Sequence, residues 1–439
     1  MIREMQVEEL QTIQLVSLMV MRHFLIALSC AAVAGVIVGL AGALILWTVR
    51  SAKPAGRQSG FSTFSSSYVL ARGRFRKAAR RLGARLVALE ISATGPRRQN
   101  LTIDIACFGA ERPRRVFVHG CGLHGVEAFT GAAIQLRWLK NGIPRLAPQD
   151  AIVLVHALNP YGMAFVRRFN ENNVDLNRNF RKADEYAPEP LPFWTAVNAL
   201  LNPDRPPGRF PFYLRAGLFL ARHLRRDVRA AIAGGQCLNE KGLFFGGHAM
   251  EEGTLAFQEW IRERFSSAER IVVIDVHTGL GEYGEDRLLV DGSIERAIPN
   301  QAMRQAFGSR LEALDGGSTA YPVRGAQQNM YFQLFPQAEV CFATQEFGTY
   351  SPLRVLKALH DENRLHFYGE QTPIGVRKSI KAELREVFNP KARVWRERVL
   401  ERGEAVIEQG LRLAFPDEDA SRSSVPTILA LSVGAMSER

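Results

Sequence analysis

The stretch that most constrains the fold of this chain is Val118–Leu136, which reads VHGCGLHGVEAFTGAAIQL. Residues Arg115–His119 alternate in polarity like a strand, and apolar residues then recur at helical spacing as far as Leu139. His124 and Glu127 therefore lie where a strand leads into a helix, the place where open α/β sheets bind ligands. An imidazole and a carboxylate three residues apart suit a metal ion. A helix-capping glutamate beside an incidental histidine is the alternative interpretation.

Other strands and helices alternate along the 439 residues. A helix is predicted over Tyr68–Leu89, helical segments over 188–229, and helices from Tyr350 to about Pro416. Further strands are predicted at Leu101–Cys107, Ala151–Ala157, Ile271–His277 and Val340–Phe347. This alternation predicts an α/β fold in which helices sandwich a mixed, largely parallel sheet.

The N-terminal region contains a long apolar run. Residues 24–49 carry no charge, and at about 1.5 Å per residue such a helix exceeds the roughly 30 Å of a bilayer core. We expect a membrane anchor there, and the basic residues after it favour a cytoplasmic main body. If translation starts at Met21 instead, the orientation argument weakens, and a misassigned start leaves a soluble cytoplasmic protein. The expected division is an N-terminal segment with linker (1–59), a folded domain (60–415) and a disordered tail (416–439).

Composition narrows the class of protein. Hydrophobic residues make up 46% and charged residues 23% of the chain, which is typical of a globular protein. The formal net charge of +12 lies largely in basic runs at residues 72–85 and 222–229. These runs contain a single aromatic residue, Phe75, and no nucleic-acid motif. We therefore expect solvated helix faces, with an anionic membrane surface as the next interpretation. Five dispersed cysteines indicate reduced thiols.

A polar segment, Leu158–Phe180, has neither helical nor strand periodicity. Long irregular stretches inside a domain are usually functional or disordered. This one contains planar donor groups suited to carboxylates and carbonyl oxygens, together with Asp175, which can orient them. Its donors are Arg167, Arg168, Asn177 and Arg178. A surface loop held by asparagine turns is the alternative.

Two later strands end in side chains that can do chemistry. The buried-type strand Ile271–His277 delivers His277 to its end, and Asp275, two residues earlier, shares its face. Glu346 terminates the apolar strand Val340–Phe347, where desolvation would raise its pKa and suit it to act as a general base. A structural histidine and a solvated glutamate are the alternatives.

Taken in order, these motifs are HxxE (His124, Glu127), an arginine followed by DLNRNF (Arg168, Asp175, Asn177, Arg178), DxH (Asp275, His277) and Glu346. The series resembles the zinc carboxypeptidase superfamily, the carboxypeptidase A-like metallopeptidases. It looks closest to a bacterial branch described mostly as a domain of unknown function. The resemblance covers roughly residues 60–413. It implies one Zn²⁺ per chain with three protein ligands, namely His124, Glu127 and His277.

The resemblance also implies the remaining roles. Glu346 matches the general base, and Arg168 the arginine that polarises the scissile carbonyl and stabilises the oxyanion. Asn177 and Arg178 match the pair that grips a free substrate carboxylate, and Asp175 the acid that orients the first histidine. Asp275 is expected to orient His277. The tyrosine that caps the substrate in digestive carboxypeptidases has no assignable equivalent, although Tyr283, Tyr321 and Tyr331 are candidates.

We therefore expect a zinc-dependent metallocarboxypeptidase-like hydrolase that cleaves a C-terminal peptide or related amide bond. Its partner would be a peptide or acylated amino acid with a free carboxylate, not a nucleic acid. One alternative is an N-acyl amino-acid or small-amide deacylase of the aspartoacylase or succinylglutamate desuccinylase type. The predicted helices after Tyr350, where such deacylases carry a β-rich extension, favour the peptidase. A second alternative is a non-catalytic, membrane-tethered binding protein. His119 and His156 are expected to be structural.

Overall fold

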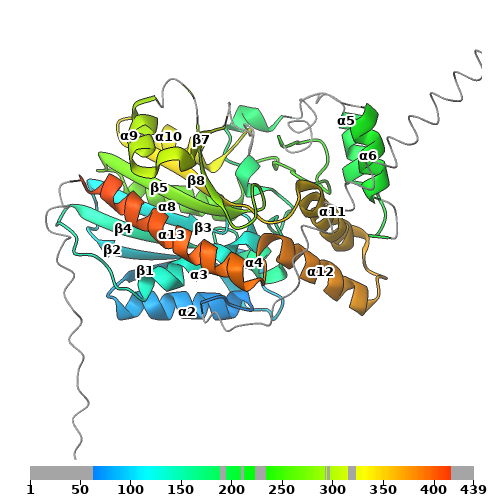
Figure 1. The fold of residues 1–439 in the computed structure, drawn as a ribbon, viewed down its shortest axis with the longest axis horizontal. Helices are drawn as coiled ribbons and strands as arrows, with labels where there is room; N and C mark the ends of the chain where they lie inside the picture. Colours follow the sequence, from blue (N-terminus) through cyan, green and yellow to red (C-terminus); the bar gives the residue numbers. More distant parts are fainter. Residues whose placement is uncertain are drawn as a thin grey trace, which may run out of the picture. The chain divides into compact units, whose positions relative to one another are not determined.

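The computed structural model describes residues 63–187, 194–208, 212–222, 234–291, 293, 297–314 and 323–416. Within them, eight strands form one sheet (Figure 1). The strands are β1 (Arg85–Thr94), β2 (Asn100–Gly109), β3 (Arg115–Cys121), β4 (Asp150–His156), β5 (Arg270–Thr278), β6 (Asp286–Val290), β7 (Leu311–Ala313) and β8 (Glu339–Phe347). Their order in the sheet is β1-β2-β4-β3-β5-β8-β6-β7.

Within the described residues, helices connect and cover these strands. The α-helices are α2 (Tyr68–Arg81), α3 (Ala128–Leu139), α4 (Pro160–Phe165), α5 (Trp194–Leu201), α6 (Phe212–Arg222), α8 (Glu252–Arg264), α9 (Ala297–Phe307), α10 (Gln327–Leu334), α11 (Pro352–Tyr368), α12 (Ile374–Phe388) and α13 (Arg393–Ala414). Short 3-10 helices are η1 (Gly125–Glu127), η2 (Leu176–Arg178), η3 (Ala183–Tyr186) and η5 (Gly308–Arg310).

The centre of the sheet is parallel. Neighbouring strands run parallel from β4 through β3 and β5 to β8, whereas β1/β2, β2/β4 and β6/β8 are antiparallel. The predicted mixed α/β sheet is thus confirmed. Because β3, β5 and β8 are parallel, their carboxyl ends meet at one edge, where His277 lies opposite Glu346 in register.

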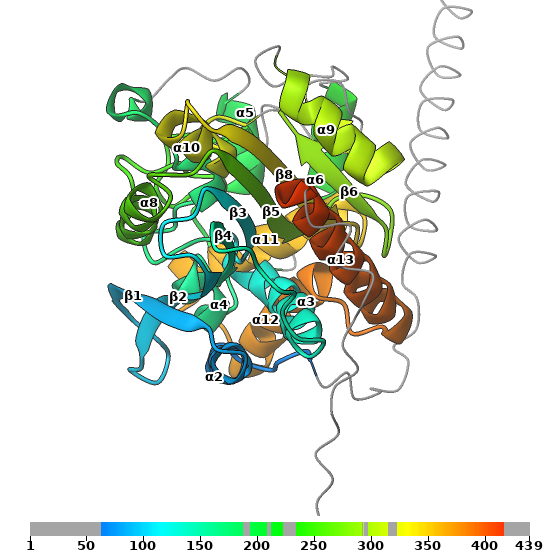
Figure 2. The same cartoon turned by 90° about the vertical axis from the view of Figure 1, so that its left-hand side faces the viewer.

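The sheet lies between two layers of helices. Helices α2, α3, α9 and α13 contribute to the core on one face, and α8 and α10 to the core on the other. Figure 2 shows α13 on one side of the central strands and α8 with α10 on the opposite side. Strand β5 is almost wholly buried between these layers, as its continuous apolar run predicts. A rigid, two-sided core therefore holds the carboxyl ends of the central strands in place.

One predicted element is wrong. The helix expected over Tyr68–Leu89 ends at Arg81, and residues from Arg85 onward form β1 instead. Gly83 takes a φ of +80° there, a conformation that favours glycine and ends the helix. Leu, Ala and Glu in this segment favour a helix locally, but antiparallel pairing with β2 overrides that preference. Strands β6 and β7 were also not predicted.

The predicted membrane anchor lies outside the residues that the structure describes. No helix within the part of the chain that the structure describes is long and apolar enough to cross a bilayer. Residues 24–49, where the anchor is predicted, and residues 417–439, which make up nearly all of the predicted tail, lie outside the described residues. Both expectations therefore stay predictions.

Candidate metal centre

Three side chains converge at the carboxyl-terminal edge of the central strands. His124 follows β3 and precedes η1, Glu127 is the last residue of η1, and His277 lies near the end of β5. Their potential ligand atoms all lie within 4.8 Å of one another. The three residues are 3%, 1% and 4% exposed, respectively. Among the described residues, this is the group of histidine, cysteine and acidic side chains that can hold a metal ion.

Both imidazoles present the same nitrogen to the shared carboxylate. Nδ1 of His124 is 2.9 Å from Oε1 of Glu127, and Nδ1 of His277 is 3.4 Å from Oε2. The opposite nitrogens, Nε2, contact Asp175 Oδ1 at 3.1 Å and Asp275 Oδ2 at 2.7 Å. A carboxylate that holds the outer nitrogen fixes the ring so that the inner nitrogen is available to a metal. The structure thus brings both expected orienting acids beside their histidines.

The charges of the site fit a divalent cation. Four carboxyl groups are buried here, those of Glu127, Asp175, Asp275 and Glu346. Two guanidinium groups, those of Arg168 and Arg178, accompany them. When these six groups are ionised and both imidazoles are in the neutral form that binds a metal, the site carries two net negative charges, which one divalent cation such as Zn²⁺ would balance. Buried charge without compensation is costly, and the buried Nδ1 of His124, although 2.9 Å from Glu127 Oε1, makes no hydrogen bond of suitable geometry. The donor set therefore suits a metal.

Arg168 bridges the ligand and the acid that orients His124. Its Nη1 donates to Glu127 Oε1 at 3.1 Å, and its Nε donates to Asp175 Oδ2 at 3.0 Å. Burial raises the pKa of Asp175, but Arg168, Arg178 and His124 outweigh it and hold that pKa well below its usual range. The neighbouring Arg167 points away, toward α11. Of the two adjacent arginines, the structure places the expected one at the site.

Glu346 lies beside the ligands at the end of β8. The residue is 7% exposed, and its Oε1 accepts a hydrogen bond from the backbone N–H of Leu280 at 2.9 Å. Burial first, and then the charge of Glu127, raise the pKa of Glu346 to about 7. A carboxyl group with this pKa can accept and return a proton near neutrality.

Asn177 and Arg178 lie on η2, whose first residue follows Asp175. Arg178 Nη1 donates to the carbonyl oxygen of Asn177 at 3.0 Å, and Asn177 Oδ1 accepts from the backbone N–H of Gln327 at 3.2 Å. The guanidinium carbons of Arg168 and Arg178 lie 5.7 and 5.9 Å from the centre of the Phe244 ring. Phe244 thus connects the two arginines, and no spacing in the sequence indicated it.

The other histidines lie apart from the ligands. His119 and His156 are fully buried; the ring of His119 contacts Gln135, and that of His156 stacks on Phe75. Burial lowers the pKa of each to about 4. Both are core residues, as expected. His248 is exposed and pairs with Glu240 on a surface loop.

The capping tyrosine stays unassigned. Tyr331 belongs to α10 and is 1% exposed, with its side chain in the core, so it cannot reach over a substrate. Tyr283 packs edge-on against Tyr350, and Tyr321 lies outside the described residues. The described cysteines are free and buried, which agrees with reduced thiols.

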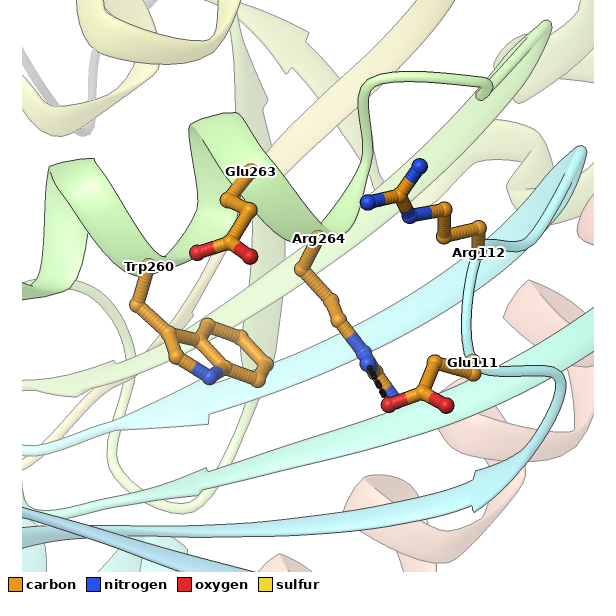
Figure 3. Close-up of a pocket in the computed structure, with 5 residues that line it drawn as sticks. All are labelled: Glu111, Arg112, Trp260, Glu263 and Arg264. Carbon is orange, nitrogen blue, oxygen red and sulfur yellow. Dashed lines mark hydrogen bonds and ion pairs between the residues drawn. The ribbon is translucent and has the colours of Figure 1, made fainter.

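A surface hollow of about 490 Å³ lies at the other edge of the sheet. Figure 3 shows its lining, in which Arg264 pairs with Glu111. The hollow is bordered by the turn between β2 and β3 and by the end of α8, so it adjoins the starts of the parallel strands. Its lining residues are Glu111, Arg112, Trp260, Glu263 and Arg264. It is therefore separate from the metal centre.

One known protein family matches most of this chain. The sequence profile of the family described as "Protein of unknown function (DUF2817)" matches residues 64–402, in agreement with the expected branch. The search of curated proteins finds no match.

Among solved structures, carboxypeptidase A from Helicoverpa armigera is 12% identical, with 77% of this chain and 78% of that chain covered and a TM-score of 0.38. Bovine thrombin-activatable fibrinolysis inhibitor, in complex with tick carboxypeptidase inhibitor, is 12% identical, with 78% and 100% covered and a TM-score of 0.39. Succinylglutamate desuccinylase from Chromobacterium violaceum is 15% identical, with 73% and 74% covered and a TM-score of 0.33. Because these TM-scores are low, a function is inferred from the residues of the site and not from these structures.

Proposed function

The chain belongs to the DUF2817 family, and within it we propose a zinc-dependent hydrolase of the metallocarboxypeptidase type. Its reaction is the cleavage of a C-terminal peptide bond or a related amide bond. One observation carries the proposal: two buried histidines turn Nδ1 toward Glu127, while separate carboxylates hold their outer nitrogens. Two imidazoles and one carboxylate are a donor set that suits zinc.

The ligand set leaves room for chemistry. Three protein ligands leave a coordination position open, as in catalytic rather than structural zinc sites. A divalent cation held there polarises the scissile carbonyl and acidifies water. The residues around it perform the remaining steps.

Glu346 is the proton carrier in this proposal. Its carboxylate takes a proton from the attacking water as the new carbon–oxygen bond forms, and it returns that proton to the leaving amine as the carbon–nitrogen bond breaks. The backbone N–H of Leu280 holds Oε1 in place, and the raised pKa makes the carboxyl group a sufficiently strong base.

Arg168 and Arg178 are the anion-binding groups. The Arg168 guanidinium lies against Glu127, where it can stabilise negative charge that develops on the carbonyl oxygen of the substrate. Arg178, with Asn177, is placed to bind the free carboxylate of a peptide or acylated amino acid. We also propose, from the sequence alone, that the domain is cytoplasmic and that residues 24–49 tether it to a membrane.

A peptide panel tests the function. Zinc-loaded protein is given matched peptides with free and amidated C termini, together with N-acyl amino acids. A site built around Arg178 should disfavour the amidated peptide by roughly 2 kcal/mol, or about 30-fold in kcat/KM. The variant Arg178→Gln should lose this preference, which controls for other effects of amidation.

Each outcome separates the proposals. Equal rates on free and amidated peptides would remove the carboxypeptidase assignment. Turnover of N-acyl amino acids alone would favour the deacylase. No turnover in a broad amide library, combined with intact ligand binding by Glu346→Gln, would favour a non-catalytic binding protein.

A further inference from the structure

Helix α12 contacts the segment that carries one ligand, although none of its residues belongs to the site described above. Val126, which precedes Glu127 in η1, is fully buried. Its surroundings include three apolar residues of α12: Leu384, Val387 and Phe388. Helix α12 therefore packs directly against η1.

The end of α12 contacts the strand that carries a second ligand. The carbonyl oxygen of Phe388 accepts a hydrogen bond from Oγ1 of Thr278 at 2.7 Å. Thr278 follows His277, and its backbone N–H donates to Glu127 Oε2 at 3.0 Å. One helix thus adjoins both of the polypeptide segments that provide Glu127 and His277.

A lysine of α12 holds a strained turn at the end of α4. Val166 has a φ of +53°, which is unfavourable for a β-branched residue and persists only where its surroundings impose it. Lys381 Nζ donates to the carbonyl oxygens of Phe165 at 2.9 Å and Val166 at 3.3 Å. It also pairs with the buried Oε1 of Glu362 at 2.7 Å.

The residues after this turn hold the ligand segment. The carbonyl oxygen of Arg167 accepts from the backbone N–H of Val126 at 2.8 Å, and that of Arg168 accepts from Gly125 at 3.2 Å. The side chain of Arg168 reaches Glu127 itself. A shift of the turn would therefore move both η1 and the arginine that contacts its carboxylate.

The side chain of Arg167 locks the turn from the other direction. Its Nε donates to the same Oε1 of Glu362 at 3.0 Å, and its Nη2 donates to Asn363 Oδ1 at 3.1 Å. Arg167, Glu362 and Asn363 are almost fully buried. Glu362 thus joins Lys381 and Arg167 in one network that ties α11 and α12 to the turn.

We infer that Lys381 is a positioning residue of the metal centre, acting through the turn at Phe165–Val166 on η1 and Arg168. This inference rests on the proposed function, because it requires a metal ion at His124, Glu127 and His277. Lys381 touches no ligand, so its effect passes through the backbone. Removal of its ammonium group should loosen the geometry of the ligands without removing any of them.

Cobalt binding to the full chain tests this inference. Wild type, Lys381→Met and Lys381→Arg are titrated with Co²⁺ against a chelator, and the visible absorption bands report the ligand geometry. We expect Lys381→Met to weaken Co²⁺ binding about tenfold, at the lower end of the effect of groups that orient ligands, and to shift the bands. Lys381→Arg, which keeps the charge, should recover part of the affinity.

Arg115→Met is the matched control, because Arg115 pairs with buried Asp150 at the opposite edge of the sheet. It should lower the melting temperature and leave the Co²⁺ bands unchanged. Thr278→Val, which removes the hydroxyl group that binds Phe388, should shift the bands even if Lys381→Met does not fold.

Identical Co²⁺ affinity and bands in Lys381→Met and wild type would overturn the inference, as would losses in Arg115→Met of the same size. Failure of wild type to bind Co²⁺ would instead remove the proposed function, and this inference with it.

Discussion

Charged side chains are arranged differently at the two edges of the central sheet, the one where the parallel strands begin and the one where they end. At the edge where the parallel strands begin, four arginines each pair with one carboxylate, and several of these pairs face solvent. The pairs are Arg114–Glu269, Arg115–Asp150, Arg270–Glu339 and Arg264–Glu111. At the edge where the strands end, four buried carboxyl groups share two guanidiniums and surround two histidines.

This difference indicates that the charges at the first edge stabilise the fold, whereas those at the second edge are arranged to bind a ligand. Paired charges at the first edge compensate one another and need no ligand. At the second edge, burial first and then the charge of Glu127 raise the pKa of Glu346 to about 7. Such a concentration of like charge is typical of a functional site. The hollow in Figure 3 lies at the first edge, apart from the buried carboxyl groups of the second.

The largest expected effect comes from Glu346→Gln at the carboxyl-terminal edge. The amide cannot accept the proton of the attacking water, so kcat should fall by about 10²- to 10⁴-fold. Metal content should stay that of wild type, because Glu346 is not a ligand. Steady-state kinetics with metal analysis of the same sample measure both, and full activity in the variant would exclude Glu346 as the base.

At the opposite edge, Arg115→Met should affect stability alone. It leaves Asp150 buried without its partner, and we expect a loss of about 3 kcal/mol in the free energy of unfolding. Denaturant titration gives this value. A change in zinc content of the folded variant would show that the two edges are coupled and would break the comparison.

His156 lies at the carboxyl-terminal end of β4, much as His277 lies near the end of β5. We expect His156 to be a structural histidine and not a metal ligand. Its folded pKa of about 4 lies below the unfolded value near 6.5. The unfolded state therefore binds the proton first, and stability falls as the pH drops from 6.5 to 4. Both ring nitrogens lack partners, so His156→Leu should cost little at pH 8.

This variant should also remove about 3 kcal/mol of the acid-induced loss of stability. Unfolding measured at pH 8, 6 and 4 tests the prediction. Parallel pH curves for the variant and wild type would contradict the assignment.

The smallest effect is expected for Arg114→Ala. Its ion pair with Glu269 is about 60% exposed on both sides, and such pairs contribute less than about 1 kcal/mol. Thermal unfolding at low and high salt measures the contribution. A larger loss would mean that the pairs at this edge are not independent of one another.

Much of the fold could be predicted from the sequence because the central strands are buried on both faces. The apolar runs that form β5 and β8 appear as strands without knowledge of their neighbours. The first strand was missed because its residues favour a helix locally, and only pairing with β2 makes it a strand. A local sequence pattern does not predict the conformation of a segment where a long-range contact determines it.

The residues of the candidate site could likewise be predicted only where the local sequence identifies them. His124 and Glu127 are close in sequence, and His277 and Glu346 end recognisable strands, so each could be named before the structure placed them together. Phe244 and Lys381 could not, because they reach the site only through tertiary contacts.

Zinc content per chain, measured after dialysis of wild type and His277→Ala, tests the central claim most directly. We predict one zinc ion per wild-type chain and a large loss in His277→Ala, with circular dichroism showing that the variant remains folded. Arg115→Met, although less stable, should keep its zinc. One zinc ion per chain in folded His277→Ala would contradict the assignment of His124, Glu127 and His277 as the metal centre.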